Sequence, residues 1–289
     1  MKQQTYTNNK PTLYLVATPI GNLEEMTFRS INVLKSVKLI ACEDTRNTKI
    51  LTNHYNIVTP LISYHKYNEK AMCDKLLYTL ENEGDVALVS DAGYPLISDP
   101  GSILVESVIA RGYNVTTISG PCAFLNALVA SNMDLSSFTF IGFLDAKSSS
   151  RKKQLKNLKE KKETLIFYES VHRIEETLID MLEVLGDRKA TLARELTKKF
   201  EEYTRDNISE IIKSLNEFTK GEFVIVVEGN KEEKEIEEKE IIEEVNDLVD
   251  KGERSKIAAE IIANKYNLKK NYVYDLYIKN KAWFRPFFV

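Results

Sequence analysis

Val86-Ala-Leu-Val-Ser-Asp-Ala-Gly-Tyr-Pro-Leu-Ile-Ser-Asp-Pro-Gly101 joins a short apolar run to a polar loop that is rich in glycine and proline. The apolar run predicts a buried strand. Gly93 allows a sharp turn or the close approach of a ligand, because it has no Cβ, while Pro95 and Pro100 stiffen the loop. Open α/β sheets bind small molecules at the carboxyl ends of their strands, and long ordered loops are often functional. We therefore expect a ligand loop, with a plain connection to a helix at 102–111 as the alternative.

The composition is that of a globular protein with room for two domains and a small appendage. The chain has 289 residues, of which 43% are hydrophobic, and this share is sufficient to bury a core. No apolar run is long enough to cross a membrane, and the polar residues 1–12 lack the core of a signal peptide, so we expect a cytoplasmic protein with no membrane contact. Three cysteines without CxxC spacing, and only three histidines, argue against a disulfide framework and against a metal site.

The net charge of −3 hides a strong asymmetry along the chain. Residues 231–250 carry three lysines and ten acidic residues, whereas residues 147–162 hold eight basic residues and one acid, and residues 251–289 hold nine and three. Clustered basic charge on a nearly neutral chain suits local contact with phosphate groups. For residues 147–162, which include Arg151, Lys152 and Lys153, a solvated helix face is an equally good interpretation.

Strand and helix patterns alternate along the first 230 residues. Such alternation predicts an α/β fold of mostly parallel sheets with helices on both faces, and a close pair of strands near residues 190–204 indicates that the second sheet is mixed. We expect domains at residues 1–133 and 134–230, with the boundary between residues 132 and 137. The expected strands are 13–17, 38–42, 86–90, 114–118, 138–142, 164–168, 190–194, 201–204 and 223–228, and the expected helices are 28–36, 45–54, 69–81, 102–111, 123–131, 150–161, 173–185 and 208–215.

Residues 231–289 form a third segment. Residues 231–240 are highly charged and predict a linker that leads into a helix. Ile257, Ala258, Ile261 and Ile262 then recur at helical spacing, residues 264–270 break the pattern, and residues 272–278 resume it. Two short helices joined by a tight turn resemble a helix-turn-helix unit. A small bundle used for packing or dimerization fits the pattern equally well, but the basic surplus favours contact with RNA.

Two further glycine- and proline-containing loops follow predicted strands. One is Thr18-Pro-Ile-Gly-Asn-Leu23, and the other is Ser119-Gly-Pro-Cys-Ala123, where Pro121 suits the first turn of a helix. Together with the Asp91 loop they predict a crevice for an adenosine-bearing ligand at one edge of the sheet. None of them is a G-x-G-x-x-G fingerprint or a Walker A loop, which argues against NAD and ATP.

Polar residues at two other strand ends are candidates for binding or catalysis. In Ala41-Cys-Glu-Asp-Thr-Arg46, Arg46 suits a phosphate, whereas Asp44 is better explained as a helix cap. The loop Ser63-Tyr-His-Lys-Tyr-Asn-Glu69 interleaves His65 and Lys66 with tyrosines, as base stacking and phosphate contact require. A surface loop without function is the alternative for this second segment.

Two segments of the second predicted domain also combine strand ends with charge. Phe167-Tyr-Glu-Ser-Val-His-Arg173 ends a strand and begins a helix, and its His172 is better explained by capping or packing than by catalysis. Ala193-Arg-Glu-Leu-Thr-Lys-Lys-Phe-Glu-Glu202 carries Arg194, Lys198 and Lys199 between two strands. We interpret residues 193–202 as another candidate site for binding phosphate groups.

Seven motifs occur in the order TPIGNL, ACEDTR, SDAGYPLISDPG, SGPCA, FYESVHR, ARELTKKFEE and GEFVIVVEG. Together they resemble the ribosomal RNA small-subunit methyltransferase I family, a branch of the tetrapyrrole methylase superfamily. The resemblance covers residues 12–230, and the C-terminal segment is similar to that family's small helical RNA-binding appendage. Val171 stands where the family usually has proline, and Cys122 where serine is usual; neither departure is expected to change the chemistry.

The resemblance implies two α/β domains with S-adenosylmethionine in the cleft between them, usually in a homodimer. It also implies methyl transfer to the ribose 2′-hydroxyl of a cytidine in the decoding centre of 16S rRNA, so that the 30S subunit or its RNA is the partner. Several cofactor contacts would be made by backbone atoms. By matching of motifs, the cofactor would contact Pro19, Asp91, Ala92, Gly93, Tyr94, Ile97, Cys122, Ala123, Tyr168 and Leu196. The RNA would contact Arg46, Lys66, Arg151, Lys152, Lys153, Arg173, Arg194 and Lys199.

The reaction is an in-line displacement, in which the protein mainly aligns oxygen, methyl and sulfur. A ribose hydroxyl is a poor nucleophile, so a positioned base would help, and Asp44, His65 and Lys198 are the candidates for that base or for substrate positioning. Two alternatives remain, a methylase of a small tetrapyrrole and a non-catalytic RNA-binding protein. The basic segments favour an RNA substrate over a tetrapyrrole macrocycle. The intact loops at Pro19, Gly93 and Ala123 argue against a protein that has kept the fold but lost catalysis.

Overall fold

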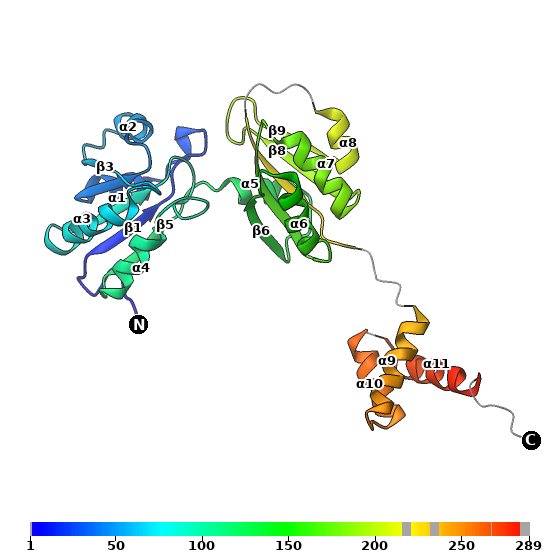
Figure 1. Ribbon diagram of the computed structural model, residues 1–289. Helices are drawn as coiled ribbons and strands as arrows, with labels where there is room; N and C mark the ends of the chain where they lie inside the picture. Colours follow the sequence, from blue (N-terminus) through cyan, green and yellow to red (C-terminus); the bar gives the residue numbers. More distant parts are fainter. Residues whose placement is uncertain (1, 216–220, 232–236, 267, 284–289) are drawn as a thin grey trace, which may run out of the picture. The chain divides into compact units, whose positions relative to one another are not determined.

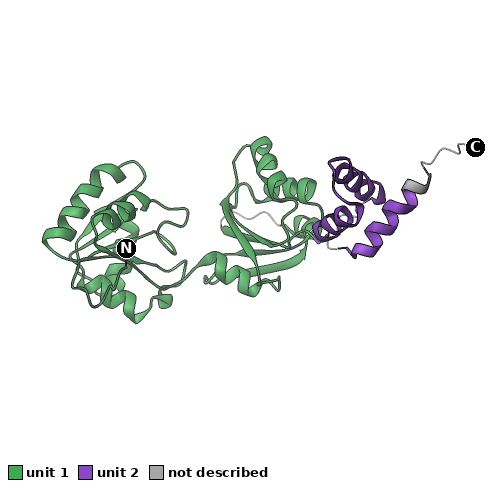
Figure 2. Ribbon diagram, turned by 90° about the horizontal axis from the view of Figure 1, so that it is seen from below, with its two compact units in different colours: residues 1–230 green, residues 231–289 purple. Residues whose placement is uncertain are grey.

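The computed structural model describes residues 2–215, 221–231, 237–266 and 268–283. The chain divides into two compact units, residues 1–230 and residues 231–289, which are coloured separately in Figure 2. None of the helices within the described ranges is long and apolar enough to span a lipid bilayer.

The first half of the larger unit is a doubly wound sheet, labelled in Figure 1. Its five strands are all parallel and lie in the order β3-β2-β4-β1-β5. The strands are β1 (Thr12–Val16), β2 (Leu39–Cys42), β3 (Leu61–Ser63), β4 (Val86–Val89) and β5 (Asn114–Ile118), and the helical segments are η1 (Leu23–Glu25), α1 (Phe28–Ser36), α2 (Thr45–His54), α3 (Glu69–Asn82) and α4 (Ser102–Ala110). The predicted parallel sheet is thus confirmed, with the short strand β3 as an unpredicted edge.

Alternation along the strands divides this half into two cores, because successive side chains point to opposite faces. On β4, Val86 and Leu88 belong to the cluster that contains Leu77 of α3 and Leu104 of α4. Ala87 and Val89 belong to the cluster on the other face, which contains residues of α1 and α2. A strand buried on both faces requires a continuous apolar run, which explains the composition of residues 86–89.

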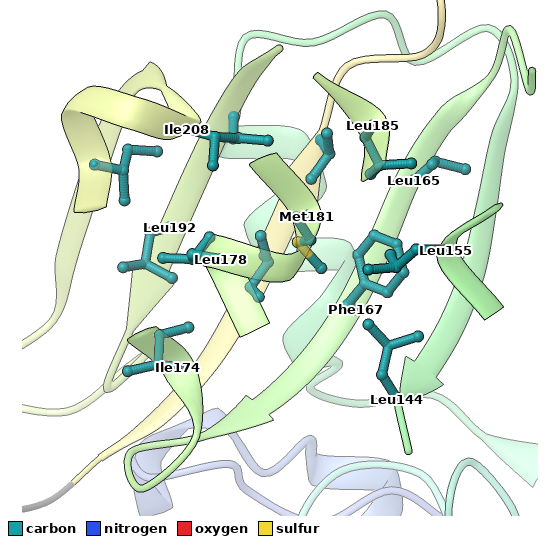
Figure 3. Packing of buried hydrophobic residues seen from close by; sticks show 14 of the residues in the cluster. Leu144, Leu155, Leu165, Phe167, Ile174, Leu178, Met181, Leu185, Leu192 and Ile208 are labelled. Atoms are coloured by element: carbon teal, nitrogen blue, oxygen red, sulfur yellow. The ribbon is translucent and has the colours of Figure 1, made fainter. Parts of the chain in front are cut away.

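The second half is a mixed sheet in the order β6-β7-β10-β8-β9. Its first pair is parallel and the other three pairs are antiparallel, which confirms the mixed sheet that was predicted. The elements are α5 (Ala123–Ala130), β6 (Phe138–Phe143), α6 (Ser148–Leu158), β7 (Thr164–Ser170), α7 (Ile174–Leu185), β8 (Lys189–Arg194), β9 (Glu202–Asn207), α8 (Ile208–Ser214) and β10 (Glu222–Val227). Figure 3 shows one face of this sheet, where Leu178 and Met181 of α7 pack with Phe167 and Leu192.

Helix α5 belongs structurally to the second sheet. Ala127 and Leu128 pack in one cluster with Ile166, Val224 and Val226, on the face opposite that of α7. The chain therefore leaves the first sheet at Ile118, where β5 ends, 14 residues before residue 132, where the expected boundary begins. The sequence pattern showed an apolar helix at this position but not the sheet on which it packs.

The smaller unit has a hydrophobic core of its own. It consists of α9 (Glu238–Asp250), α10 (Ser255–Lys265) and α11 (Lys270–Trp283), which pack through Ile241, Val245, Ala258, Ile262 and Val273 among others. The helix expected after the linker thus begins at Glu238; residues 232–236 of that linker lie outside the described residues. The break expected at 264–270 separates α10 from α11, with residue 267 outside the described residues as well.

Candidate functional site

Three loops meet at the carboxyl edge of the first sheet, because β1 lies between β4 and β5 and the strand ends Val89, Val16 and Ile118 are in register. The loops after β1 and β4 form a short antiparallel bridge, in which Thr18 and Gly93 exchange two backbone hydrogen bonds of 2.9 and 3.0 Å. The Tyr94 hydroxyl accepts a hydrogen bond from the backbone N–H of Gly120, at 3.2 Å, and so ties in the third loop. The predicted meeting of the three loops is therefore present.

A cavity of about 360 Å³ opens between these loops and the second sheet. Its volume falls in the range of small-molecule sites, about 300–1,000 Å³. Of the ten residues expected to contact a cofactor, nine line it, namely Asp91, Ala92, Gly93, Tyr94, Ile97, Cys122, Ala123, Tyr168 and Leu196. Pro19 is not a lining residue, but its neighbour Ile20 is.

Unusual backbone conformations gather around the cavity. Gly93 has a φ of +73°, and the non-glycine residues Leu96 and Ser98 of the same loop have φ values of +73° and +69°. On the facing loop of the second sheet, Glu195 and Thr197 have φ values of +50° and +68°. Such conformations cost about 1–3 kcal/mol each at non-glycine residues and tend to cluster at functional sites. Of these five residues, Gly93, Ser98 and Glu195 line the cavity directly.

The second sheet supplies an aromatic wall. The Tyr168 ring lies 5.0 Å from the Phe140 ring and 5.5 Å from the Phe143 ring, measured between centroids. Burial raises the pKa of the Tyr168 phenol and also that of the Cys122 thiol. Both groups are therefore neutral at physiological pH, and Cys122 acts as a small uncharged side chain, in keeping with the serine usual in the resembled family.

Asp99 is a titratable group of the cavity that the sequence analysis did not select. It is half-buried, and burial together with the charges of Glu43 and Asp91 raises the pKa of its carboxyl to about 6; an interaction with the Ser90 hydroxyl acts in the opposite direction. Asp99 stood within the quoted loop, but no pattern in the sequence indicates that Glu43, more than fifty residues earlier, lies near it. Phe143 and Ser170, which also line the cavity, were missed for the same reason.

A second, more open groove of about 450 Å³ adjoins the cavity and shares Asp91 with it. Asp44, Arg46, His65 and Tyr67 line this groove, so the two polar motifs from separate strand ends do come together. Arg46 and Tyr67 project into solvent, with 88% of the Arg46 side chain and 94% of Tyr67 exposed. His65 Nδ1 is buried and has no hydrogen-bond partner within the described part of the chain.

The geometry corrects the expectation that Asp44 serves as a base. Its carboxylate accepts a hydrogen bond from the backbone N–H of Arg46, at 2.8 Å, which caps α2, and it forms an ion pair of 2.7 Å with the same residue. These contacts lower the pKa of Asp44 to about 2. A carboxylate of such low basicity is a weak proton acceptor at neutral pH, so capping, the alternative interpretation, explains Asp44 better.

Arg151 is a second correction, because it is not available to RNA. Only 1% of its surface is exposed, and its Nε donates to the buried carboxylate of Asp180 at 2.6 Å. Its Nη1 donates to the Ala146 carbonyl, at 3.2 Å. Arg151 therefore fastens α6 to α7 and to the preceding loop. The charge run 147–162 looked like a solvated face because the partner lies 29 residues further along the chain.

The other candidates for RNA contact fall into two groups. Arg46, Lys66, Lys153 and Lys199 are exposed. The others are partly buried and form ion pairs: Lys152 with the exposed Glu183 at 2.6 Å, Arg194 with the exposed Glu202 at 3.4 Å, and Arg173 with the buried Glu169 at 2.8 Å. Lys198, which was expected near the reaction, lines the cavity and pairs with Glu195 at 3.0 Å.

Comparisons with known proteins identify the family of the chain and the fold of its two sheets. The family model of the tetrapyrrole (corrin/porphyrin) methylases matches residues 12–212. Among curated relatives, the ribosomal RNA small subunit methyltransferase I of Halalkalibacterium halodurans is 46% identical over 95% of this chain and 98% of its own length, and that of Bacillus subtilis is 47% identical over 92% and 93%.

Solved structures give the same fold at low sequence identity. A uroporphyrin-III-C-methyltransferase from Thermus thermophilus matches with a TM-score of 0.52 at 15% identity, covering 76% of this chain and 94% of its own. A cobalt precorrin-4 methyltransferase matches with a TM-score of 0.55 at 15% identity, over 75% and 94%. At such identities the likeness concerns the fold of the two sheets alone.

Proposed function

The chain belongs to the tetrapyrrole methylase family, with ribosomal RNA small subunit methyltransferases I among its curated relatives, and from this premise we propose that it methylates the ribose 2′-hydroxyl of a cytidine in the decoding centre of 16S rRNA. S-adenosylmethionine is the methyl donor of this family. The observation that carries the proposal is the cavity at the three strand ends, which nine of the ten expected cofactor residues line. We also propose that the enzyme acts in the cytoplasm, as a homodimer, on the 30S subunit.

The residues of the cavity fit this donor. Its volume suits a ligand of nucleoside size, the aromatic wall at Tyr168 offers an apolar face, and the loops at Gly93 and Cys122 offer backbone groups without bulky side chains. When bound, the donor supplies a methyl group that its sulfonium has already activated. The task left to the chain is to hold the donor, exclude water, and bring a hydroxyl into line.

RNA would approach from the adjoining groove. Tyr67 offers an exposed ring on which a base can stack, and Arg46 and Lys66 offer positive charge to the backbone. Because the groove and the cavity share Asp91, a nucleotide held there would present its sugar to the donor. The C-terminal unit, in which α10 and the basic start of α11 form a helix-turn-helix-like pair, would add a second contact with RNA.

Acceptors of three kinds test the proposal against its alternatives. The protein is incubated with S-adenosylmethionine labelled in its methyl group and with 30S subunits that lack the modification, with free 16S rRNA, or with a reduced tetrapyrrole. We expect label in the RNA, recovered as 2′-O-methylcytidine after digestion. Label in the tetrapyrrole alone would favour the small-molecule methylase, and binding to 30S subunits without transfer or donor binding would favour a non-catalytic protein.

The exposed lysines should contribute to RNA affinity through release of counterions. Replacing both Lys153 and Lys199 with glutamine is expected to weaken binding to 30S subunits and to reduce the slope of log K against log salt by about 0.7–0.9 for each phosphate that the variant no longer neutralises. The slope is measured by filter binding between low and moderate salt. Lys213→Gln is the matched control, because Lys213 is an exposed lysine already paired with Glu210 at 2.7 Å; equal slopes for both variants would exclude the proposed contact.

A further inference from the structure

Five carboxylates line the cavity: Asp91, Asp99, Glu169, Glu195 and Glu222. They differ in what holds them. The buried Glu169 accepts hydrogen bonds from the Arg173 guanidinium and, at 2.7 Å, from the Thr177 hydroxyl. Glu195 pairs with Lys198 at 3.0 Å, and that lysine also lies 3.9 Å from the largely exposed Glu222. Glu169 and Glu195 are therefore engaged by neighbouring side chains, and Glu222 lies largely in solvent.

The two aspartates of the β4 loop remain. The Asp91 carboxylate accepts hydrogen bonds from the Asp44 backbone N–H at 3.2 Å and from the Asn47 side-chain amide at 2.8 Å, so it fastens the loop to the start of α2. Asp99 has no cationic partner within the ranges that the structure describes. It is the cavity carboxylate that combines partial burial with freedom from an ion pair.

The surroundings of Asp99 place it where donor and acceptor would meet. It lines the cavity, and the charged groups that act on it are Asp91, which lines both cavity and groove, and Glu43, which lines the groove. The Ser90 hydroxyl and the neutral Tyr168 phenol also lie near it. Burial and the two negative charges raise the pKa of Asp99 to about 6. A base is most effective when its pKa lies near the working pH.

The earlier candidates for the base are less well placed. Asp44 is a helix cap in an ion pair. Lys198 lines the cavity, but its Nζ is already engaged in the ion pair with Glu195 at 3.0 Å. His65 lines the groove and not the cavity.

We propose that Asp99 accepts the proton of the ribose hydroxyl during methyl transfer. This inference rests on the proposed function. A lone pair of the hydroxyl oxygen forms the bond to the methyl carbon, the O–H electron pair stays on that oxygen as the proton passes to the Asp99 carboxylate, and the electron pair of the breaking carbon–sulfur bond stays on sulfur. The neutral thioether leaves, and Asp99 later returns its proton to solvent.

The test compares Asp99→Asn with Glu106→Gln, which removes an exposed carboxylate from α4, the next helix. Methyl transfer to 30S subunits is followed at saturating donor. We expect Asp99→Asn to lower kcat about 10²–10⁴-fold, with the KM for 30S subunits and the donor Kd from calorimetry within about threefold of wild type. Glu106→Gln should retain wild-type kcat. In the wild type, log kcat should rise with unit slope below pH 6 and level off above it.

Two readouts do not depend on activity. In protein carrying ¹³C-labelled aspartate, one carboxyl resonance, absent from Asp99→Asn, should titrate near pH 6. Because the pKa of Asp99 in the folded protein lies above its unfolded value of about 3.9, its contribution to stability is present below pH 4 and is lost as the pH rises through 6. Asp99→Asn should therefore be at least as stable as the wild type at about pH 8.

Each other result overturns the inference. A kcat within threefold of wild type, with the same pH profile, would show that Asp99 is not the proton acceptor although the protein is a methyltransferase. An Asp99 resonance that titrates near pH 4 would show that burial and the neighbouring charges do not raise the pKa of this carboxyl, and would remove the reason to choose it as the base. If the wild type itself transferred no label to any rRNA, the proposed function would fail, and the role of Asp99 with it.

Discussion

Gly93→Val is expected to weaken the binding of S-adenosylmethionine by about 100-fold or more, measured by calorimetry. Gly93 has a φ of +73°, and a β-branched residue in that region is strongly strained. The added Cβ would also lie 3.5 Å from Ile20 Cγ2 and 3.8 Å from the Pro121 carbonyl oxygen, within the three loops that meet at the cavity. We expect the loop to relieve about 3 kcal/mol of strain by shifting away from the donor. A free-energy difference of that size corresponds to the expected loss of about 100-fold in affinity.

The control for this substitution is Gly186→Val. Gly186 has a φ of +86°, and nothing lies within 4 Å of the position of its added Cβ, so the change imposes comparable backbone strain at the end of α7. Gly186 does not line the cavity. We expect this variant to be less stable but to bind the donor with wild-type affinity. If Gly93→Val kept wild-type affinity, or if both variants lost it equally, the donor would not depend on the Gly93 loop.

Arg151→Met is expected to lower the free energy of unfolding by about 3 kcal/mol, the lower end of the usual cost of removing one partner of a buried ion pair. The Asp180 side chain is only 6% exposed, and without Arg151 its carboxylate would keep only the partly exposed Lys152 at 3.4 Å and the Ser148 hydroxyl at 3.1 Å, which offset part of the loss. Urea denaturation followed by circular dichroism measures the loss. A residue chosen from a basic run as an RNA contact should thus have its largest effect on folding.

Lys153→Met is the matched control, because Lys153 is the exposed residue two positions along the same helix. Its unfolding free energy should equal that of the wild type, while its affinity for 30S subunits falls. If Arg151→Met were as stable as the wild type but bound RNA poorly, Arg151 would be an RNA contact. That result would contradict its role in holding α6 against α7.

The architecture was largely predictable because its central strands are buried on both faces. A strand such as β4 must be apolar throughout and is followed by a loop with glycine at the turn, so both features appear in the sequence. Strand β3 was missed because its three residues at the sheet edge follow Pro60 and form no apolar run. The position of α5 was misjudged because an apolar helix does not reveal which of two sheets it covers.

The residues of the candidate site also differ in how well the sequence reveals them. Residues that bind through the backbone at strand ends, such as Gly93 and Ala123, are recognisable because glycine, proline and small residues gather there. Side chains whose behaviour depends on distant partners are not. Arg151 looks solvated until Asp180 is placed beside it, and Asp99 looks ordinary until Glu43 and Asp91 raise its pKa.

A crystal structure of the protein grown with S-adenosylmethionine is the most direct measurement of the central claim, which is that three strand-end loops and the facing sheet form the methyl-donor site. We predict density for the donor in the cavity, in contact with the backbone at Ala92, Gly93 and Ala123 and with Leu196. Density for the donor elsewhere on the protein, or a cavity that stays empty at donor concentrations well above the Kd measured by calorimetry, would contradict the account.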